Sequence, residues 1–106
     1  MNHFRVVMRI GQDYVADNRH FTYEQAATEQ QRILISPTFR SQDTGSVGVR
    51  VMHWRTFRKL CDKGEGCTMN RLDDNVRRFG RDAMKLSPLA TRADELRHLF
   101  TQQGGK

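Results

Sequence analysis

Two segments of this chain alternate apolar and polar residues, which is the pattern of a β-strand with one buried face. Residues 3–10 read HFRVVMRI and residues 47–54 read VGVRVMHW. Their apolar faces would consist of Phe4, Val6, Met8 and Ile10 in the first segment and Val47, Val49 and Val51 in the second. Residues 14–16 could form a short third strand after a turn at 11–13. Two or three strands are not stable alone in water, so helices must cover the apolar faces.

A helix is predicted over residues 23–35. Thr22 is a typical N-cap, and Gln25 stands at the position that completes a capping box. Pro37 ends the helix, because a residue that precedes proline avoids the helical conformation. The turn-forming residues 36–46 then predict a flexible loop, and the apolar spacing within residues 57–61 predicts a short helix, with a turn over 62–66.

The clearest helical signal covers residues 69–86. Apolar residues recur there at intervals of three and four, and they are Met69, Leu72, Val76, Phe79, Ala83 and Leu86. Asn70 is the expected N-cap. Gly80 costs a helix about 1 kcal/mol relative to Ala, so we expect a close packing contact at that position. A last helix should follow a cap at Thr91, with an apolar face of Ala93, Leu96, Leu99 and Phe100.

These elements predict a small α+β domain of two layers over residues 1–101, with residues 102–106 as a frayed C-terminal tail. Two or three antiparallel strands would pack against three to four helices. No apolar run is long enough to span a membrane, and the N-terminal residues lack the apolar core of a secretory signal. Two cysteines are too few for the disulfide framework of a small secreted domain. We therefore expect a cytoplasmic protein without membrane contact.

The sequence gives no sign of catalysis. It contains no glycine-rich phosphate loop and no recognisable nucleophile motif. Residues 43–46, Asp-Thr-Gly-Ser, match the active-site tetrapeptide of aspartic proteases. That chemistry needs two aspartates that share a proton, in a loop that follows an apolar strand, whereas Arg-Ser-Gln precedes the motif here. We expect residues 43–46 to be a loop, and we expect neither enzymatic activity nor a cofactor.

Cys61 and Cys67 leave more than one interpretation open. With His53 or His98 they could supply zinc ligands, although their five-residue spacer is longer than the usual two to four. A disulfide across the intervening loop is also geometrically possible. The favoured prediction is no metal, with Cys61 as a small buried side chain and Cys67 as a loop thiol.

The positive charge is concentrated in the second half of the chain. The net charge is +6, and residues 1–45 sum to zero, so all of it lies in residues 46–106. Arginine outnumbers lysine, and its planar guanidinium suits phosphates, carboxylates and aromatic rings. An anionic partner is therefore expected, unless the charge merely aids solubility.

The candidate binding residues fall into two groups. The first is on or next to the polar faces of the two strands, and it consists of Arg5, Arg9, Arg50, Trp54, Arg55, Arg58 and Lys59. No acidic residue occurs among residues 46–60. The second lies opposite the apolar face of the long helix, and it consists of Arg71, Arg77, Arg78, Arg81 and Lys85. Alternatively, Trp54 belongs to the core and the arginine stems cover the edge of a helix.

The favoured hypothesis is a non-enzymatic nucleic-acid-binding domain, preferring single strands, in which arginines contact phosphates and Trp54 stacks on a base. The rival is an inhibitor or adaptor, encoded by a phage or plasmid, that docks on an acidic or nucleic-acid-binding protein surface. Arginine and tryptophan are also common anchors of protein interfaces. The sequence leaves the oligomeric state open.

Overall fold

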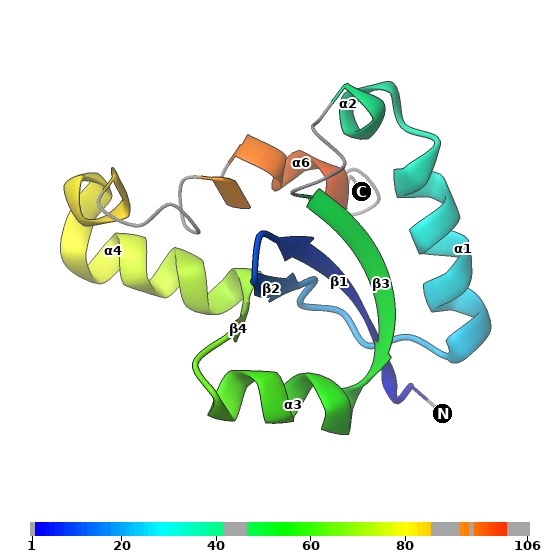
Figure 1. Cartoon of the computed structure of the whole chain (residues 1–106). Helices are drawn as coiled ribbons and strands as arrows, with labels where there is room; N and C mark the ends of the chain where they lie inside the picture. The colour runs from blue at the N-terminus through cyan, green and yellow to red at the C-terminus, as the bar shows by residue number, and fades with distance from the viewer. Residues whose placement is uncertain (1, 42–46, 86–91, 94, 102–106) are drawn as a thin grey trace.

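The centre of the molecule is a four-stranded mixed sheet with the order β3-β1-β2-β4 (Figure 1). The computed structural model describes residues 2–41, 47–85, 92, 93 and 95–101, but not the side chains of 76, 79, 81–85 and 101. The strands are β1 (Phe4–Ile10), β2 (Asp13–Ala16), β3 (Val47–His53) and β4 (Gly66–Thr68). β1 pairs antiparallel with β2 and β3, and β4 pairs parallel with β2. Gly11, at φ +63°, forms the tight turn of the β1–β2 hairpin.

The helices are α1 (Tyr23–Leu34), α2 (Pro37–Arg40), α3 (Trp54–Asp62), α4 (Met69–Lys85) and α6 (His98–Thr101). The capping box of α1 is confirmed. The Thr22 hydroxyl accepts the Gln25 N–H at 3.2 Å, and the Gln25 side chain accepts the Thr22 N–H at 3.1 Å. Within the described residues no helix is long and apolar enough to cross a lipid bilayer.

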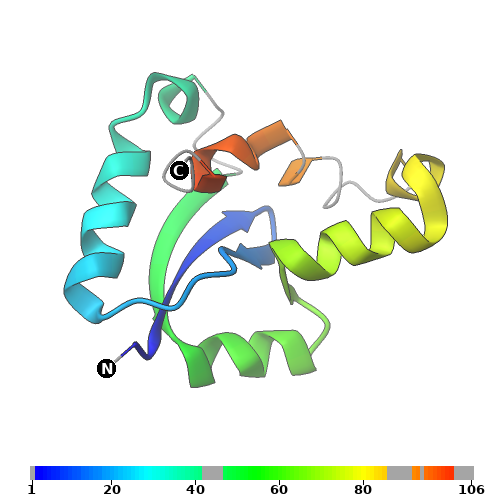
Figure 2. The ribbon, with the colours of Figure 1, turned by 180° about the vertical axis from the view of Figure 1, so that it is seen from behind.

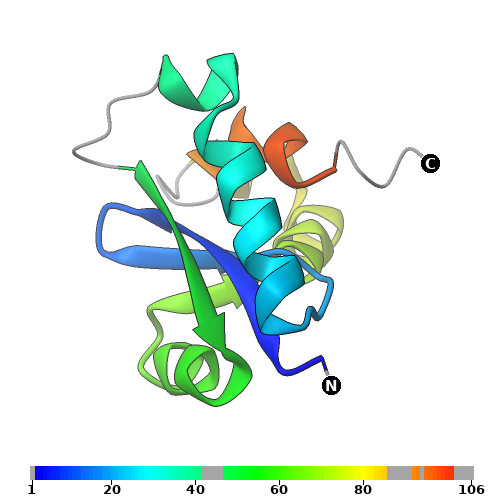
Figure 3. The same ribbon diagram turned by 90° about the vertical axis from the view of Figure 1, so that its right-hand side faces the viewer.

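The main core lies on the face of the sheet that α1 and the C-terminal residues cover. Cross-strand pairing places Val6 opposite Val51 and Met8 opposite Val49, as the alternation of both segments predicts. The predicted apolar face of the last helix is also buried in this core, through Ala93, Leu96, Leu99 and Phe100. Figure 3 shows α1 against this side of the sheet.

The opposite face of the sheet is covered by α3. Val7, which the alternation assigned to an outward face, is fully buried in a second small core with Ala16 and Phe57. The α+β class is confirmed, but the sheet has helices on both faces instead of one. Two or three antiparallel strands were predicted, whereas the sheet has a fourth strand, β4, which pairs parallel with β2. β4 occupies the end of the predicted turn 62–66 and the two residues that precede the predicted long helix.

The structure corrects two local predictions, the loop over residues 36–46 and the Asn70 cap. Residues 37–40 form the short helix α2, with Pro37 in the first turn, where proline needs no N–H partner. Thr68 caps α4 instead of Asn70, since its hydroxyl accepts the Arg71 N–H at 3.2 Å. The N–H of Asn70 donates to the side chain of Asn18 at 2.7 Å.

Gly80 has a different role from the expected one. No atom of the described residues lies within 4 Å of where its Cβ would be, so the expected close contact is not found among them. Its backbone, at φ 81° and ψ 171°, instead interrupts the helical geometry of α4 with a kink. L-residues rarely adopt this conformation, which explains glycine at this position.

Other sequence predictions fall outside the described residues. They concern the loop at 43–46, the Thr91 cap, the tail 102–106, and the side chains of Val76, Phe79, Ala83 and Leu86. The described start of the repeat, Met69 and Leu72, is buried as predicted.

Candidate nucleic-acid interface

The outer surface of α3 carries three exposed cations, Arg55, Arg58 and Lys59. Phe57, on the opposite side of the helix, is buried against the sheet and fixes the direction in which the helix faces. The helix begins directly at the end of β3, where His53 acts as N-cap and its Nδ1 accepts the Arg55 N–H at 3.1 Å. The small core beneath α3 therefore sets which side of the helix, and so which of its cations, faces the solvent.

The exposed cations of α3, and Arg50 on the edge strand β3, are not neutralised by ion pairs within the described part of the chain. Arg50, exposed on β3, and Arg58 and Lys59 have no hydrogen bond or ion pair with any described residue. The guanidinium of Arg55 lies over the Trp54 ring at 5.3 Å from its centroid. We call Arg50, Arg55, Arg58 and Lys59 the basic face. Such unpaired, hydrated charges are available to an anionic ligand without first breaking an internal ion pair.

Arg5 and Arg9 each donate a hydrogen bond to a backbone carbonyl of the fold, unlike the cations of the basic face. Arg5 donates to the backbone carbonyl of Asp17 at 2.8 Å, contacts His20 at 2.9 Å, and stacks over Phe57. Its partial burial lowers the pKa of its guanidinium. Arg9 donates to the Gly11 carbonyl at 2.8 Å. The sequence could not separate these roles, because alternation identifies a face but not the helix that covers it.

Trp54 is half-buried and belongs to a row of aromatic rings. The ring of His53 stacks on Trp54 at a centroid separation of 6.0 Å and on His3 at 5.9 Å. Phe4 forms T-shaped pairs with His53 and Tyr23, at centroid separations of 5.4 and 5.3 Å. Sequence analysis found Trp54 but missed the other rings, which three separate segments bring together.

The arginines of α4 form a separate surface. The helix leads away from the sheet (Figure 2), and Arg71, Arg77 and Arg78 are exposed on it. Arg77 pairs with Asp74 on the same helix at 3.3 Å. The side chains of Arg81 and Lys85 lie outside the described residues. This group is therefore less clearly basic than the face on α3.

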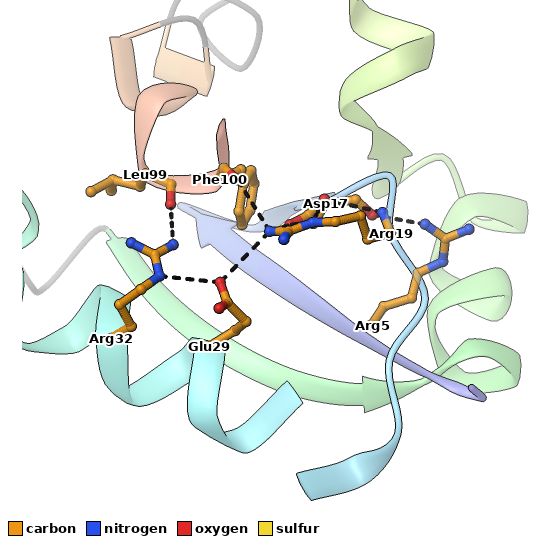
Figure 4. Close-up of polar contacts among 7 residues, drawn as sticks. All are labelled: Arg5, Asp17, Arg19, Glu29, Arg32, Leu99 and Phe100. Atoms are coloured by element: carbon orange, nitrogen blue, oxygen red, sulfur yellow. Dashed lines mark hydrogen bonds and ion pairs between the residues drawn. The ribbon is translucent and has the colours of Figure 1, made fainter. Parts of the chain in front are cut away.

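A charged network on the other side of the sheet was not expected from the sequence. The Asp17 carboxylate, 6% exposed as a residue, accepts hydrogen bonds from Arg19, including one of 2.6 Å. Arg19 also contacts Glu29, which pairs with Arg32 at 3.1 Å. The two arginines donate to the carbonyls of Phe100 and Leu99, at 3.1 and 2.6 Å, as Figure 4 shows. The hydrogen-bonded carboxylate raises the pKa of Arg19.

This network has a structural role. Arg19, in the segment before α1, and Arg32, in α1, donate to backbone carbonyls of α6. The network thereby holds α6 on the rest of the fold. We call Asp17, Arg19, Glu29 and Arg32 the clamp. The paired charges of the clamp leave little net positive potential for a ligand, so it is not part of the candidate interface.

The two cysteines are free thiols. Cys61 packs in the small core under α3, whereas Cys67 packs against the main core on the other face of the sheet. Cys67 lies in β4, so the prediction of a loop thiol is wrong. Within the described residues no three potential His, Cys, Asp or Glu ligands gather around one point.

Both thiols should react slowly with a disulfide reagent such as DTNB at pH 7–8. Burial raises the pKa of Cys61, and it raises that of Cys67 to about 11, so little of the reactive thiolate is present. The measurement is the release of thionitrobenzoate from folded protein, with urea-unfolded protein as the control that exposes both thiols. A folded-state thiol that reacts as fast as the unfolded ones would contradict this prediction.

Comparison of the chain with models of known protein families, with curated proteins and with solved structures finds no match. The functional argument therefore depends on the basic face and on the aromatic row beside it.

Proposed function

We propose that the protein is a cytoplasmic, non-enzymatic nucleic-acid-binding domain whose basic face contacts the phosphate backbone. The observation that carries the proposal is the set of four exposed cations on β3 and α3, three of them without any partner among the described residues. Three of the four are arginines, whose planar donors match phosphate oxygens. Their rigid support, a helix held on the sheet by Phe57, favours a preformed binding surface.

The neighbouring aromatic rings favour nucleic acid over an acidic protein. An acidic protein surface offers carboxylates, which the cations alone would satisfy. A nucleic acid offers phosphates and flat bases together, and the guanidinium of Arg55 already lies on an indole ring. The rival proposal, a phage- or plasmid-encoded inhibitor or adaptor, uses the same residues as anchors for a protein partner.

A salt titration tests the proposal. If four cations contact the phosphates of a single strand, the log of the binding constant should fall with log salt concentration with a slope of about −3. The measurement is the fluorescence anisotropy of a labelled single strand and a labelled duplex at several salt concentrations. A slope near zero, or no binding of either probe at low salt, would reject the proposal and leave the protein-binding rival.

A further inference from the structure

Tyr23 is the one exposed phenylalanine, tyrosine or tryptophan among the residues whose burial the structure describes, and it lies at one end of the aromatic row. It is 60% exposed, it is the first residue of α1, and its ring makes a T-shaped contact with that of Phe4. The Tyr23 hydroxyl makes no hydrogen bond with a described residue. The stability of α1, which the Thr22 capping box begins, does not explain why an exposed aromatic residue stands here.

The row is continuous from Tyr23 to Trp54. Each ring lies 5.3–6.0 Å from the next, measured between centroids, in the order Tyr23, Phe4, His53, Trp54, and His3 stacks on His53 as a side branch. Phe4 is half-buried and supports the row, whereas Tyr23 and His3 are exposed. His3, Tyr23 and Trp54 come from three different segments of the chain. The tertiary fold, and not the local sequence, therefore brings these rings together.

Cations flank the row at both ends. At one end the Arg55 guanidinium lies over Trp54. At the other, an open groove of about 410 Å³ is lined by Tyr23, Gln30, Arg50 and Val51. Gln30 donates to the carbonyl of Val49 on the edge of β3 at 2.9 Å, and this bond joins α1 to the strand along the groove. Arg55 therefore lies at the Trp54 end of the aromatic row, and Arg50 lies at its Tyr23 end.

We propose that this row is a base-stacking platform that makes the protein a binder of single-stranded nucleic acid, with Tyr23 and Trp54 as the principal stacking residues. The inference rests on the proposed function, because the cations must hold the backbone for the bases to reach the rings. Bases in a duplex are already stacked on each other, so only an unpaired strand can place them on side chains. Arg55 has no ion pair within the described chain, so its guanidinium can leave the indole for a phosphate when a base stacks there.

The experiment compares three fluorescent probes of equal length: an oligothymidine, the same backbone with abasic sites throughout, and a duplex. The platform predicts that wild type binds oligothymidine more tightly than either other probe. Tyr23→Leu should weaken oligothymidine binding by about 5- to 150-fold, the range for loss of one stacked base. It should leave the abasic probe unaffected, and Tyr23→Phe should bind as wild type does.

Ile35→Ala is the matched control. Ile35 is 65% exposed and lies at the other end of α1, about 18 Å away for twelve helical residues. Equal binding of oligothymidine and the abasic strand would overturn the platform while leaving phosphate binding intact. Tighter binding of the duplex would overturn the preference for single strands. If Ile35→Ala lost as much affinity as Tyr23→Leu, the effect would reflect exposed apolar surface in general. That result would overturn the role of Tyr23.

Discussion

Asp17→Ala should lower the free energy of unfolding by about 2–3 kcal/mol, because it leaves a partly buried guanidinium without its main acceptor. The Asp17 carboxylate accepts three hydrogen bonds from the Arg19 side chain and one from its backbone N–H. Arg19 in turn donates to the carbonyl of Phe100. Loss of the carboxylate therefore weakens the attachment of α6, whose residues Leu99 and Phe100 belong to the main core.

Asp74→Ala is the control for this substitution. Asp74 is also paired with a nearby arginine, Arg77, but both side chains are more than half exposed. Exposed ion pairs of this type contribute about 0.3–0.5 kcal/mol. Urea unfolding followed by circular dichroism measures both variants. Similar losses in the two would show that the clamp does not hold the C-terminal part of the fold.

The triple substitution Arg50/Arg55/Arg58→Ala should weaken binding of a single strand by about 100-fold at 0.1 M salt and flatten the salt slope by about 2 units. Three phosphate contacts and the counterions that they release are lost together. The fold should be unaffected, since all three side chains are exposed and outside both cores. Anisotropy titrations give the affinity and slope, and thermal unfolding verifies the fold.

A second triple substitution, Arg71/Arg77/Arg78→Ala, removes the same charge from α4. If the basic face carries the backbone contacts, this variant should keep most of the salt slope that the first one loses. If both variants lose the same affinity, binding follows the net charge of the protein and not a localised surface.

The sequence predicted those parts of the fold that depend on local periodicity and capping. Thr22 and Gln25 cap α1 as their spacing indicates, and the alternation in β1 and β3 identifies the face of each strand that packs in the main core. It could not predict β4, because Gly66–Thr68 is three residues long and pairs with a strand fifty residues away. Val7 was assigned to an outward face for a similar reason. Alternation cannot reveal that a separate helix covers the second face of a sheet.

The candidate interface was predicted less completely. Arg55, Arg58 and Lys59 were predicted to extend the polar face of the second strand, and the structure exposes them on α3 instead. The sequence does not distinguish Arg5 and Arg19 from these exposed cations. Both hydrogen-bond Asp17, which is twelve residues from Arg5 and two from Arg19, and no helical spacing indicates these contacts. Tyr23 lies within the helix predicted over residues 23–35, but it was not among the candidate binding residues. Its place beside Phe4 depends on how α1 crosses the sheet.

The most direct test of nucleic-acid binding at this surface is a ¹H–¹⁵N NMR titration of the full chain with an unlabelled oligothymidine. Trp54 is the sole tryptophan of the sequence, so its indole N–H gives one signal that needs no assignment by mutation. We predict saturable shifts of this signal and of the amides of Tyr23, Arg55, Arg58 and Lys59, with those of α6 unchanged. An indole signal that stays fixed, while the amides of α4 shift or no signal moves at all, would contradict the proposal.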